Sequence, residues 1–315
     1  MSKIVTFTDS HIKTTTPRSR TDKHWLDLCL GQIESVFALA NSVGASAVLC
    51  SGDLGHSPNW SYPAIRGFFK ILKKYKDIQF ITTVGQHDVV GKQIEDWDST
   101  PMGLLAEIAP NMHVLEGGDS IVVDGSPSIE VYGFGFDQLE TKELLEGRYA
   151  FRYNESFRIA IVHASVGAKE DFGSSSIESQ NIHGCHVASF GDIHDGFDVY
   201  QFKSGTCAYS TGSLVRPSIS DKGRIPACAC ISIEEDHSFD IDFYDMPDGD
   251  DDVCFVSDKP KTDQKELAAE FDRILEEARS ATSESPIKRV QRIGQEMDVP
   301  KDAIDLVINS MELEQ

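Results

Sequence analysis

Five short motifs carry carboxylates, imidazoles and an amide, and each ends or follows an apolar, strand-like run. In chain order they are Asp9-Ser10-His11, Gly52-Asp53, Gly85-Gln86-His87-Asp88, His163-Ala164 and Gly191-Asp192-Ile193-His194. Parallel sheets build their sites at the carboxyl ends of strands, so these loops can converge on one cleft. Gly-Asp alone is commonly a turn, but five motifs in this arrangement favour one shared site.

The side chains of these motifs form a donor set of oxygen and nitrogen, without a thiolate. Such a set suits manganese, iron or zinc, and it exceeds what a single ion needs. Two ions about 3.5–4 Å apart can clamp a phosphate and activate a water for in-line attack, provided that one carboxylate bridges them. The motifs therefore predict metal-dependent hydrolysis of a phosphate ester.

The elements that must position these motifs alternate between strands and helices. Residues 4–7, 47–51 and 78–84 are predicted strands, and residues 25–43 and 64–75 are predicted helices with one apolar face. This order implies parallel strands covered by helices. Two sheets packed face to face, with helices outside, would form a four-layer α/β/β/α sandwich. Later strands are expected at residues 121–123, 129–132, 159–162, 187–190, 227–233 and 239–243.

The C-terminal part of the sequence differs in composition from the part before it. The acidic run at residues 247–252 lacks the spacing of a calcium-binding loop and is interpreted as a solvated linker. Apolar residues recur at helical spacing from residue 262 onward. We therefore expect a domain over residues 1–256 and a helical extension over residues 257–315.

Composition limits the classes of partner and compartment. The net charge of −22 argues against holding nucleic acid by bulk electrostatics, although bound cations or a partner subunit could supply positive charge. The seven cysteines form no C-x-x-C pair, which favours reduced, buried thiols over a zinc site. Without a signal peptide or an apolar run of ~18 residues, the expected location is the cytoplasm, with no membrane partner.

The order Asp-x-His, Gly-Asp, Gly-Asn-His-Asp, His, Gly-His-x-His is the signature of the calcineurin-like metallophosphoesterases, and residues 1–217 resemble that domain. The resemblance implies that Asp53 bridges two ions. It also implies that His87 is the general acid for the leaving oxygen or stabilises charge on the phosphate. By the same resemblance, one ion is held by Asp9, His11, Asp53 and His194, and the other by Asp53, Gln86, His163 and Asp192.

Two positions depart from the family pattern. Gln86 stands where asparagine is usual, and Asp192 stands where histidine is usual. Both side chains can bind a hard metal through oxygen, but the longer glutamine would make the second site looser. The extra carboxylate favours manganese, or magnesium as the alternative, over zinc. Two divalent ions, manganese first, are therefore the expected cofactors.

Three segments resemble the SbcD-type nucleases within this family. Residues 52–58 resemble the segment in which a histidine contacts the substrate phosphate, so His56 has that role or is an exposed loop histidine. Residues 211–216 resemble the Gly-Ser turn of that group, and residues 98–105 are similar to its phage-type members. The Gly-Asn-His-Glu and Asp-Arg-Gly elements of serine/threonine phosphatases are missing.

This resemblance implies a nuclease subunit that processes DNA ends, in repair or recombination, as a homodimer with a coiled-coil ATPase partner of the SbcC type. Residues 262–313 would grip that partner or pack as ordinary helices. A phage-encoded chain would act in the host cytoplasm. Two alternatives remain: a small-molecule phosphodiesterase or nucleotidase with the same metal site, and a weakly active scaffold whose second site is impaired by Gln86 and Asp192.

Overall fold

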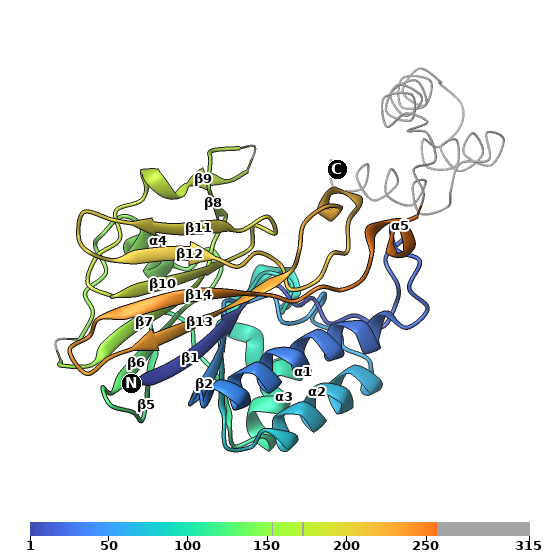
Figure 1. Ribbon diagram of the computed structural model, residues 1–315, viewed down its shortest axis with the longest axis horizontal. Coiled ribbons are helices and arrows are strands. Elements are labelled where there is room, and N and C mark those ends of the chain that lie inside the picture. The colour runs from blue at the N-terminus through green and yellow to red at the C-terminus, as the bar shows by residue number, and fades with distance from the viewer. Residues whose placement is uncertain (153, 172, 257–315) are drawn as a thin grey trace, which may run out of the picture. The chain divides into compact units, whose positions relative to one another are not determined.

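Two large β-sheets pack face to face in the computed structural model of the protein (Figure 1). The structure describes residues 1–152, 154–171 and 173–256, so the expected helices at residues 262–313 lie outside the described residues. Residues Met1–Val256 form one compact unit. None of the helices in the described ranges combines the length and apolarity that crossing a bilayer requires.

The first sheet has the strand order β14-β13-β1-β2-β3-β4. Strands β1 to β4 run parallel, while β13 is antiparallel to β1 and β14 is antiparallel to β13. The carboxyl ends of four strands therefore lie at the same edge. The bounds are β1 (Ser2–Phe7), β2 (Ala47–Cys50), β3 (Gln79–Thr82), β4 (Met112–Val114), β13 (Ala227–Ile233) and β14 (Phe239–Asp245).

The second sheet has the order β11-β12-β10-β7-β6-β5 and also contains four parallel strands. Strands β6, β7, β10 and β12 run parallel, and antiparallel strands form both edges. The bounds are β5 (Ser120–Val123), β6 (Ile129–Phe134), β7 (Phe157–His163), β10 (Val187–Gly191), β11 (Phe197–Gln201) and β12 (Cys207–Ser210). A small ribbon pairs β8 (Val166–Gly167) with β9 (Ser175–Ser176).

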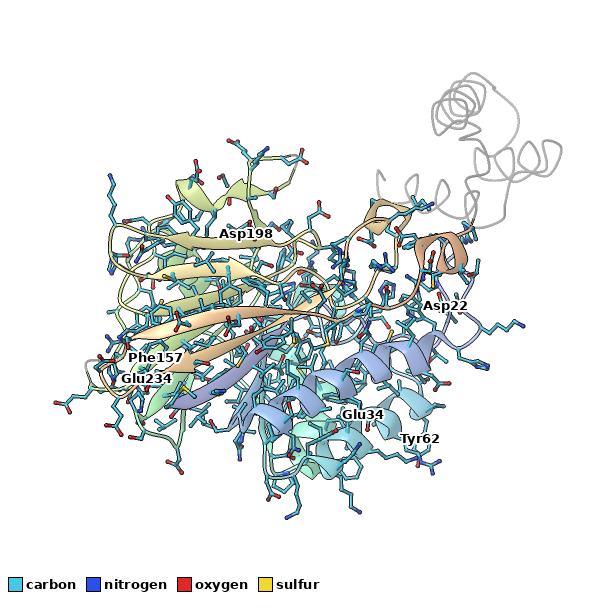
Figure 2. The ribbon with its side chains drawn as sticks, in the orientation of Figure 1. Asp22, Glu34, Tyr62, Phe157, Asp198 and Glu234 are labelled. Carbon is cyan, nitrogen blue, oxygen red and sulfur yellow. The ribbon has the colours of Figure 1, made fainter. Side chains whose placement is uncertain are left out.

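Helices form the outer layers of the sandwich. Helices α1 (Trp25–Val43), α2 (Tyr62–Lys74) and α3 (Pro101–Ile108) cover the first sheet, and α4 (Leu139–Leu145) packs on the second (Figure 1). Figure 2 shows charged side chains on both outer sides, with Glu34 on α1 and Asp198 on β11. Short 3-10 turns occur at Val90–Lys92, Ile94–Ser99, Ile177–Ser179 and Ile219–Asp221, and α5 is Asp251–Cys254.

Three apolar layers fill the spaces between these four layers. Side chains alternate along each strand, so Val5 and Phe7 of β1 pack under the helices while Ile4 packs between the sheets. On β7, Ile159 lies between the sheets and Ala160 faces the outer layer that contains α4. The structure thus confirms the predicted four-layer α/β/β/α fold.

Most predicted elements coincide with observed ones, and the short elements were missed. The helix predicted at residues 25–43 and the strand at residues 227–233 have the observed bounds. Helices α3 and α4 and strands β4, β11 and β12 were not predicted, because each is eight residues or shorter and has little periodicity to reveal it. The seven cysteines are free, and six of them are buried, as expected.

The interpretation of residues 247–252 as a solvated linker was wrong at Asp248, whereas Pro247, Gly249 and Asp250 are exposed as expected. The Asp248 side chain is fully buried between two buried arginines. One carboxylate oxygen accepts from Arg20 Nη1 at 3.1 Å, and the other accepts from Arg216 Nε at 2.5 Å. Three distant segments therefore share one internal ion-pair cluster, because two guanidinium groups can be buried only with a counter-charge.

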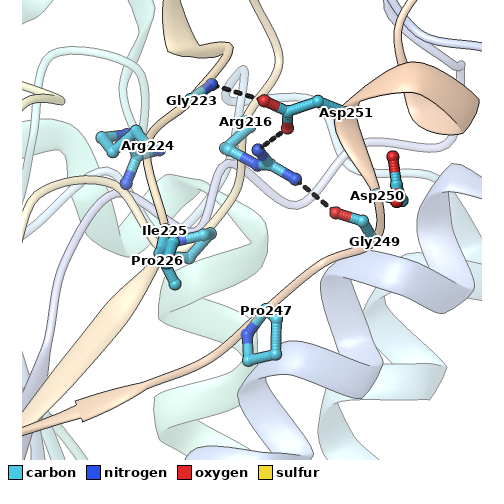
Figure 3. Close-up of a pocket in the computed structure, with 9 residues that line it drawn as sticks. All are labelled: Arg216, Gly223, Arg224, Ile225, Pro226, Pro247, Gly249, Asp250 and Asp251. Atoms are coloured by element: carbon cyan, nitrogen blue, oxygen red, sulfur yellow. Dashed lines mark hydrogen bonds and ion pairs between the residues drawn. The ribbon is translucent and has the colours of Figure 1, made fainter.

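The same segment contributes a second anchor to Arg216. Asp251 accepts a hydrogen bond from Arg216 and another, of 2.7 Å, from the backbone N–H of Gly223 (Figure 3). The Gly249 carbonyl accepts a further bond from Arg216 at 2.8 Å. These contacts fix the loop that follows β12 against the segment that follows β14.

We expect Asp248→Asn to lower the free energy of unfolding by about 1–3 kcal/mol, because it removes the buried carboxylate that the two guanidinium groups share, while Asp22 and Asp251 still pair with one arginine each. Urea denaturation followed by circular dichroism would measure the loss. The control Asp240→Asn, on the exposed side of β14, should change stability by less than about 0.5 kcal/mol. Equal effects of the two substitutions would contradict the structural role of the cluster.

Candidate metal centre

All seven predicted metal ligands lie at the edge where the carboxyl ends of the parallel strands meet. The loops after β1, β2 and β3 belong to the first sheet, and the end of β7 and the loop after β10 belong to the second. The site is therefore built across the seam between the sheets. The first sheet supplies Asp9, His11, Asp53 and Gln86, and the second supplies His163, Asp192 and His194.

Four of these residues have left-handed backbone conformations. The φ angles are 51° at Asp9, 42° at His11, 49° at Asp53 and 91° at Asp192. Non-glycine residues rarely adopt this region, and functional sites are where such residues concentrate. Hydrogen bonds between loops hold the conformation, since the N–H of Asp9 donates to Gly52 O at 3.2 Å and that of His11 donates to Asp53 O at 3.1 Å.

Two glycines are needed because ligand side chains approach the backbone closely. A Cβ atom at Gly85 would lie 2.0 Å from Asp53 Oδ1, and one at Gly52 would lie 2.3 Å from His163 Nδ1. Gly52 also has a φ of 95°. Any other residue at these positions would displace a ligand side chain.

Asp53 occupies the position expected of a bridge. Its Oδ2 lies 3.5 Å from His163 Nε2 and 4.0 Å from His11 Nε2. Two clusters of donor atoms, each within 4.8 Å, meet here: one contains Asp9, His11 and His194, and the other contains Asp9, Asp53 and His163. These clusters contain five of the seven predicted ligands, and Asp9 belongs to both of them, whereas Asp53 belongs to the second alone.

The imidazole of His163 is prepared to be a ligand. Its Nδ1 lies 2.7 Å from the Ser51 carbonyl oxygen, which can only accept, so Nδ1 carries the proton. The other nitrogen, Nε2, is buried and has no hydrogen-bond partner among the described residues. Burial disfavours a charged His163, but the carboxylates of Asp53, Asp9 and Asp192 together outweigh it and raise the pKa of His163 to about 10. These carboxylates therefore stabilise positive charge at the His163 ring.

The two residues that depart from the family pattern contact each other. Gln86 Nε2 donates to Asp192 Oδ1 at 2.5 Å, and Ser165 donates to the other Asp192 oxygen. Gln86 Oε1 is buried and has no partner within the part of the chain that the structure describes. The longer glutamine therefore reaches the aspartate and keeps an amide oxygen free as a ligand.

These features fit a pair of divalent cations. Burial raises the pKa of Asp9 and lowers the pKa of His11 to about 3. His11 therefore stays neutral and does not balance the charge of the buried carboxylates. Nε2 of His11 lies 3.0 Å from Nε2 of His194, within hydrogen-bonding distance, so the two ring nitrogens face the same point. Neutral imidazoles and buried carboxylates are the ligands that such cations use.

His87 and His56 stand beside this cluster on its exposed side. Their rings are stacked, with centroids 5.6 Å apart and planes 12° apart. The His87 side chain is 44 % exposed, and its Nε2 lies 3.9 Å from Asp53 Oδ2. Burial, together with nearby Lys13, lowers the pKa of His56 to about 4, so this ring is neutral at pH 7. Both side chains are placed to meet a substrate at the centre.

Asp88 positions two of the ligand loops, a role that the sequence reasoning missed. Its carboxylate accepts from the N–H of Gly55 at 2.8 Å and from that of Gly85 at 3.0 Å. Burial raises the pKa of Asp88 to about 7. The residue thereby ties the loop that carries Asp53 to the loop that carries Gln86.

The Gly-Ser turn supports Asp9 from behind. Ser213 Oγ donates to the Asp9 carbonyl oxygen at 2.8 Å, and the N–H of Leu214 donates to Thr8 O at 3.1 Å. Arg224 in turn donates to the carbonyl oxygens of Ser213 and Val215. The motif noted at residues 211–216 therefore has a physical role in fixing the first ligand loop.

Asp221 is a further residue that the sequence reasoning missed. Its side chain is buried, and its Oδ1 lies 4.0 Å from His194 Nδ1, the ring nitrogen that faces away from the cluster. Its Oδ2 accepts from the N–H of Ser218 at 2.7 Å, as part of a capping box. The Ser-x-x-Asp spacing was visible in the sequence and could have located this turn.

A comparison with family profiles agrees with this arrangement. The family profile described as calcineurin-like phosphoesterase matches residues 2–196, and the chain belongs to that family. No curated protein sequence matches it.

Similar solved structures include the Thermus thermophilus protein TT1561 (13 % identity, TM-score 0.45, covering 76 % of this chain and 98 % of that one). A dimetal phosphatase from Danio rerio has 10 % identity and a TM-score of 0.48, with 79 % and 96 % covered. The sulfate thiohydrolase SoxB from Thermus thermophilus has 11 % identity and a TM-score of 0.44, with 78 % and 56 % covered.

We expect Asp221→Asn to weaken divalent-cation binding by roughly 10- to 100-fold, because an acidic partner orients a ligating imidazole and raises its basicity. Isothermal titration with manganese would measure this directly. Asp198→Asn, on the exposed face of β11, is the matched control and should bind like the wild type. An unchanged manganese affinity in Asp221→Asn would contradict the proposed role of Asp221 in orienting His194.

Proposed function

We propose that the protein is a two-metal phosphodiesterase that hydrolyses DNA, acting as an SbcD-type nuclease subunit. The observation that carries the proposal is the position of the Asp53 carboxylate. Its Oδ2 lies within 4.0 Å of a nitrogen of His11, His87 and His163, so ligands and a catalytic imidazole surround one point. Family membership supports phosphoester hydrolysis as the reaction class.

The residues would divide between two ions as the family pattern implies. Asp9, His11, Asp53 and His194 would hold the first, and Asp53, Gln86, His163 and Asp192 would hold the second. When bound, divalent ions supply a Lewis acid for the phosphate oxygens and a water-derived nucleophile at neutral pH. The protein's oxygen-rich second site supports manganese, or magnesium, as the native ion.

His87 and His56 would act on the substrate itself. His87 is partly exposed, and its backbone N–H donates to Asp53 Oδ1 at 2.9 Å, which fixes the residue beside the metal ligands. It would protonate the leaving oxygen or stabilise charge on the phosphate. His56, which is stacked on it, would contact a phosphate oxygen as a neutral hydrogen-bond donor.

The choice of DNA rests on the resemblance of residues 52–58 and 211–216 to SbcD-type nucleases. It is supported by the positions of these segments, since His56 borders the metal cluster and Ser213 supports Asp9. By the same resemblance we propose a homodimer and a coiled-coil ATPase partner of the SbcC type. Small phosphodiesters are the second candidate, favoured by the net charge of −22.

Manganese-dependent cleavage of labelled linear DNA tests the proposal. We expect the wild-type protein to cleave DNA, and His87→Ala to lose about 10²- to 10⁴-fold in kcat, as removal of a general acid does. His87→Ala should keep its metal, which elemental analysis would measure. A parallel assay on cyclic nucleotides separates the two candidates, since cleavage of those alone would refute the nuclease.

We expect Asp192→His to shift metal preference toward zinc, because imidazole suits zinc while carboxylate suits manganese. The ratio of zinc to manganese affinity should rise by roughly an order of magnitude. Competition dialysis followed by elemental analysis measures this ratio. The double variant Gln86→Asn, Asp192→His restores the usual family pair and should recover any total occupancy that the single variant loses. An unchanged ratio would exclude Asp192 as a ligand.

A further inference from the structure

A groove of about 220 Å³ extends from the metal centre between the loop after β1 and the start of α2. The residues that matter here are Lys13, His56, Trp60 and Ser61. His56 belongs to both places, since its ring centroid lies 5.6 Å from that of His11 and from that of His87. The groove is therefore a continuation of the centre.

The groove differs in charge from the rest of the protein. The chain has 51 acidic and 29 basic residues, yet none of the ten residues that line the groove is acidic. Lys13 is its cation, and no ion pair of Lys13 is formed with any described carboxylate. By contrast, the pocket in Figure 3 is lined by Asp250 and Asp251 beside its arginines.

The amino end of α2 adds to this positive character. Ser61 caps the helix by accepting from the N–H of Ala64, and the first turn contains no acidic residue. The positive end of the helix dipole therefore has no local counter-charge. Lys13 and this helix end favour an anion in the groove.

The indole of Trp60 forms an ordered wall of the groove. A Cβ atom at Gly55 would lie 2.1 Å from Trp60 Nε1, so the indole packs tightly against the loop that carries His56. The ring also meets Phe68 edge-on, with centroids 6.2 Å apart. A partly buried indole held in this way offers a rigid surface for a sugar or base.

We propose that this groove binds the nucleotide adjacent to the scissile phosphate of a polynucleotide, with its phosphate at Lys13 and its sugar or base against Trp60. The inference rests on the proposed phosphodiesterase function and names the substrate class more closely. The groove, at about 220 Å³, is smaller than the roughly 300–1,000 Å³ of an ordinary small-molecule pocket. We therefore assign it to a single unit of a chain beside the catalytic centre.

The test compares Lys13→Gln with Lys76→Gln, which removes the same charge from an exposed position just after the far end of α2. Both changes are made in the manganese-loaded His87→Ala protein, so that bound substrate is not consumed. Fluorescence anisotropy with a labelled single-stranded oligonucleotide gives the affinity at several salt concentrations. Turnover of bis(p-nitrophenyl) phosphate is measured with each lysine variant in the protein that retains His87.

We expect Lys13→Gln to weaken oligonucleotide binding about 5-fold at 0.1 M salt and to reduce the salt slope by about 0.7, the value for one phosphate on a single strand. Turnover of bis(p-nitrophenyl) phosphate should fall by less than the oligonucleotide affinity does, because this small diester has no second phosphate to contact Lys13. The proposed subsite would be refuted if the two lysine variants bound the oligonucleotide with equal affinity, or if the His87→Ala parent did not bind it. A loss of turnover on the small diester as large as the loss of oligonucleotide affinity would also refute it. Lys13-dependent binding without DNA cleavage by wild type would support the groove while refuting the nuclease.

Discussion

The left-handed backbone at the ends of the strands is the constraint on which this site depends. Asp9, His11, Asp53 and Asp192 all adopt it, at a cost of roughly 1–3 kcal/mol each. The strained conformations persist because the loops hydrogen-bond to one another. The N–H of Asp192 donates to the Asp9 carboxylate at 3.1 Å, which joins a loop of one sheet to a loop of the other. The hydrogen bonds from neighbouring loops therefore stabilise the strained backbone of each loop.

Crowded charge explains why the two departures from the family pattern occur together. An aspartate at position 192 places another carboxylate near Asp9 and Asp53, which like-charge repulsion opposes. The amide of Gln86 donates to Oδ1 of Asp192, and the hydroxyl of Ser165 donates to Oδ2. An asparagine at position 86 is one methylene shorter. The glutamine that looked like a weakness of the second site therefore stabilises the unusual ligand next to it.

Much of the fold could be predicted because long buried strands and helices have strong periodicity. Helix α1 and the buried strand β13 were found with their observed bounds, whereas the short helix α4 was not. The predicted ligands could be located because each follows an apolar strand. The contacts of Asp221 with His194 and of Asp88 with Gly55 could not be predicted, since only the tertiary fold brings these partners near. Asp248 was misjudged for the same reason, because its two arginines are distant in sequence.

The placement of the ligands across the seam has a consequence for how the molecule holds together. An ion held by Asp53 of one sheet and His163 of the other would cross-link layers that otherwise adhere by apolar packing and a few hydrogen bonds, such as that from Ser51 to Ser189. Separating the sheets would then separate the proposed ligands. Assembly of the sandwich and uptake of metal would be linked equilibria, since neither half-sandwich alone contains the full set of proposed ligands.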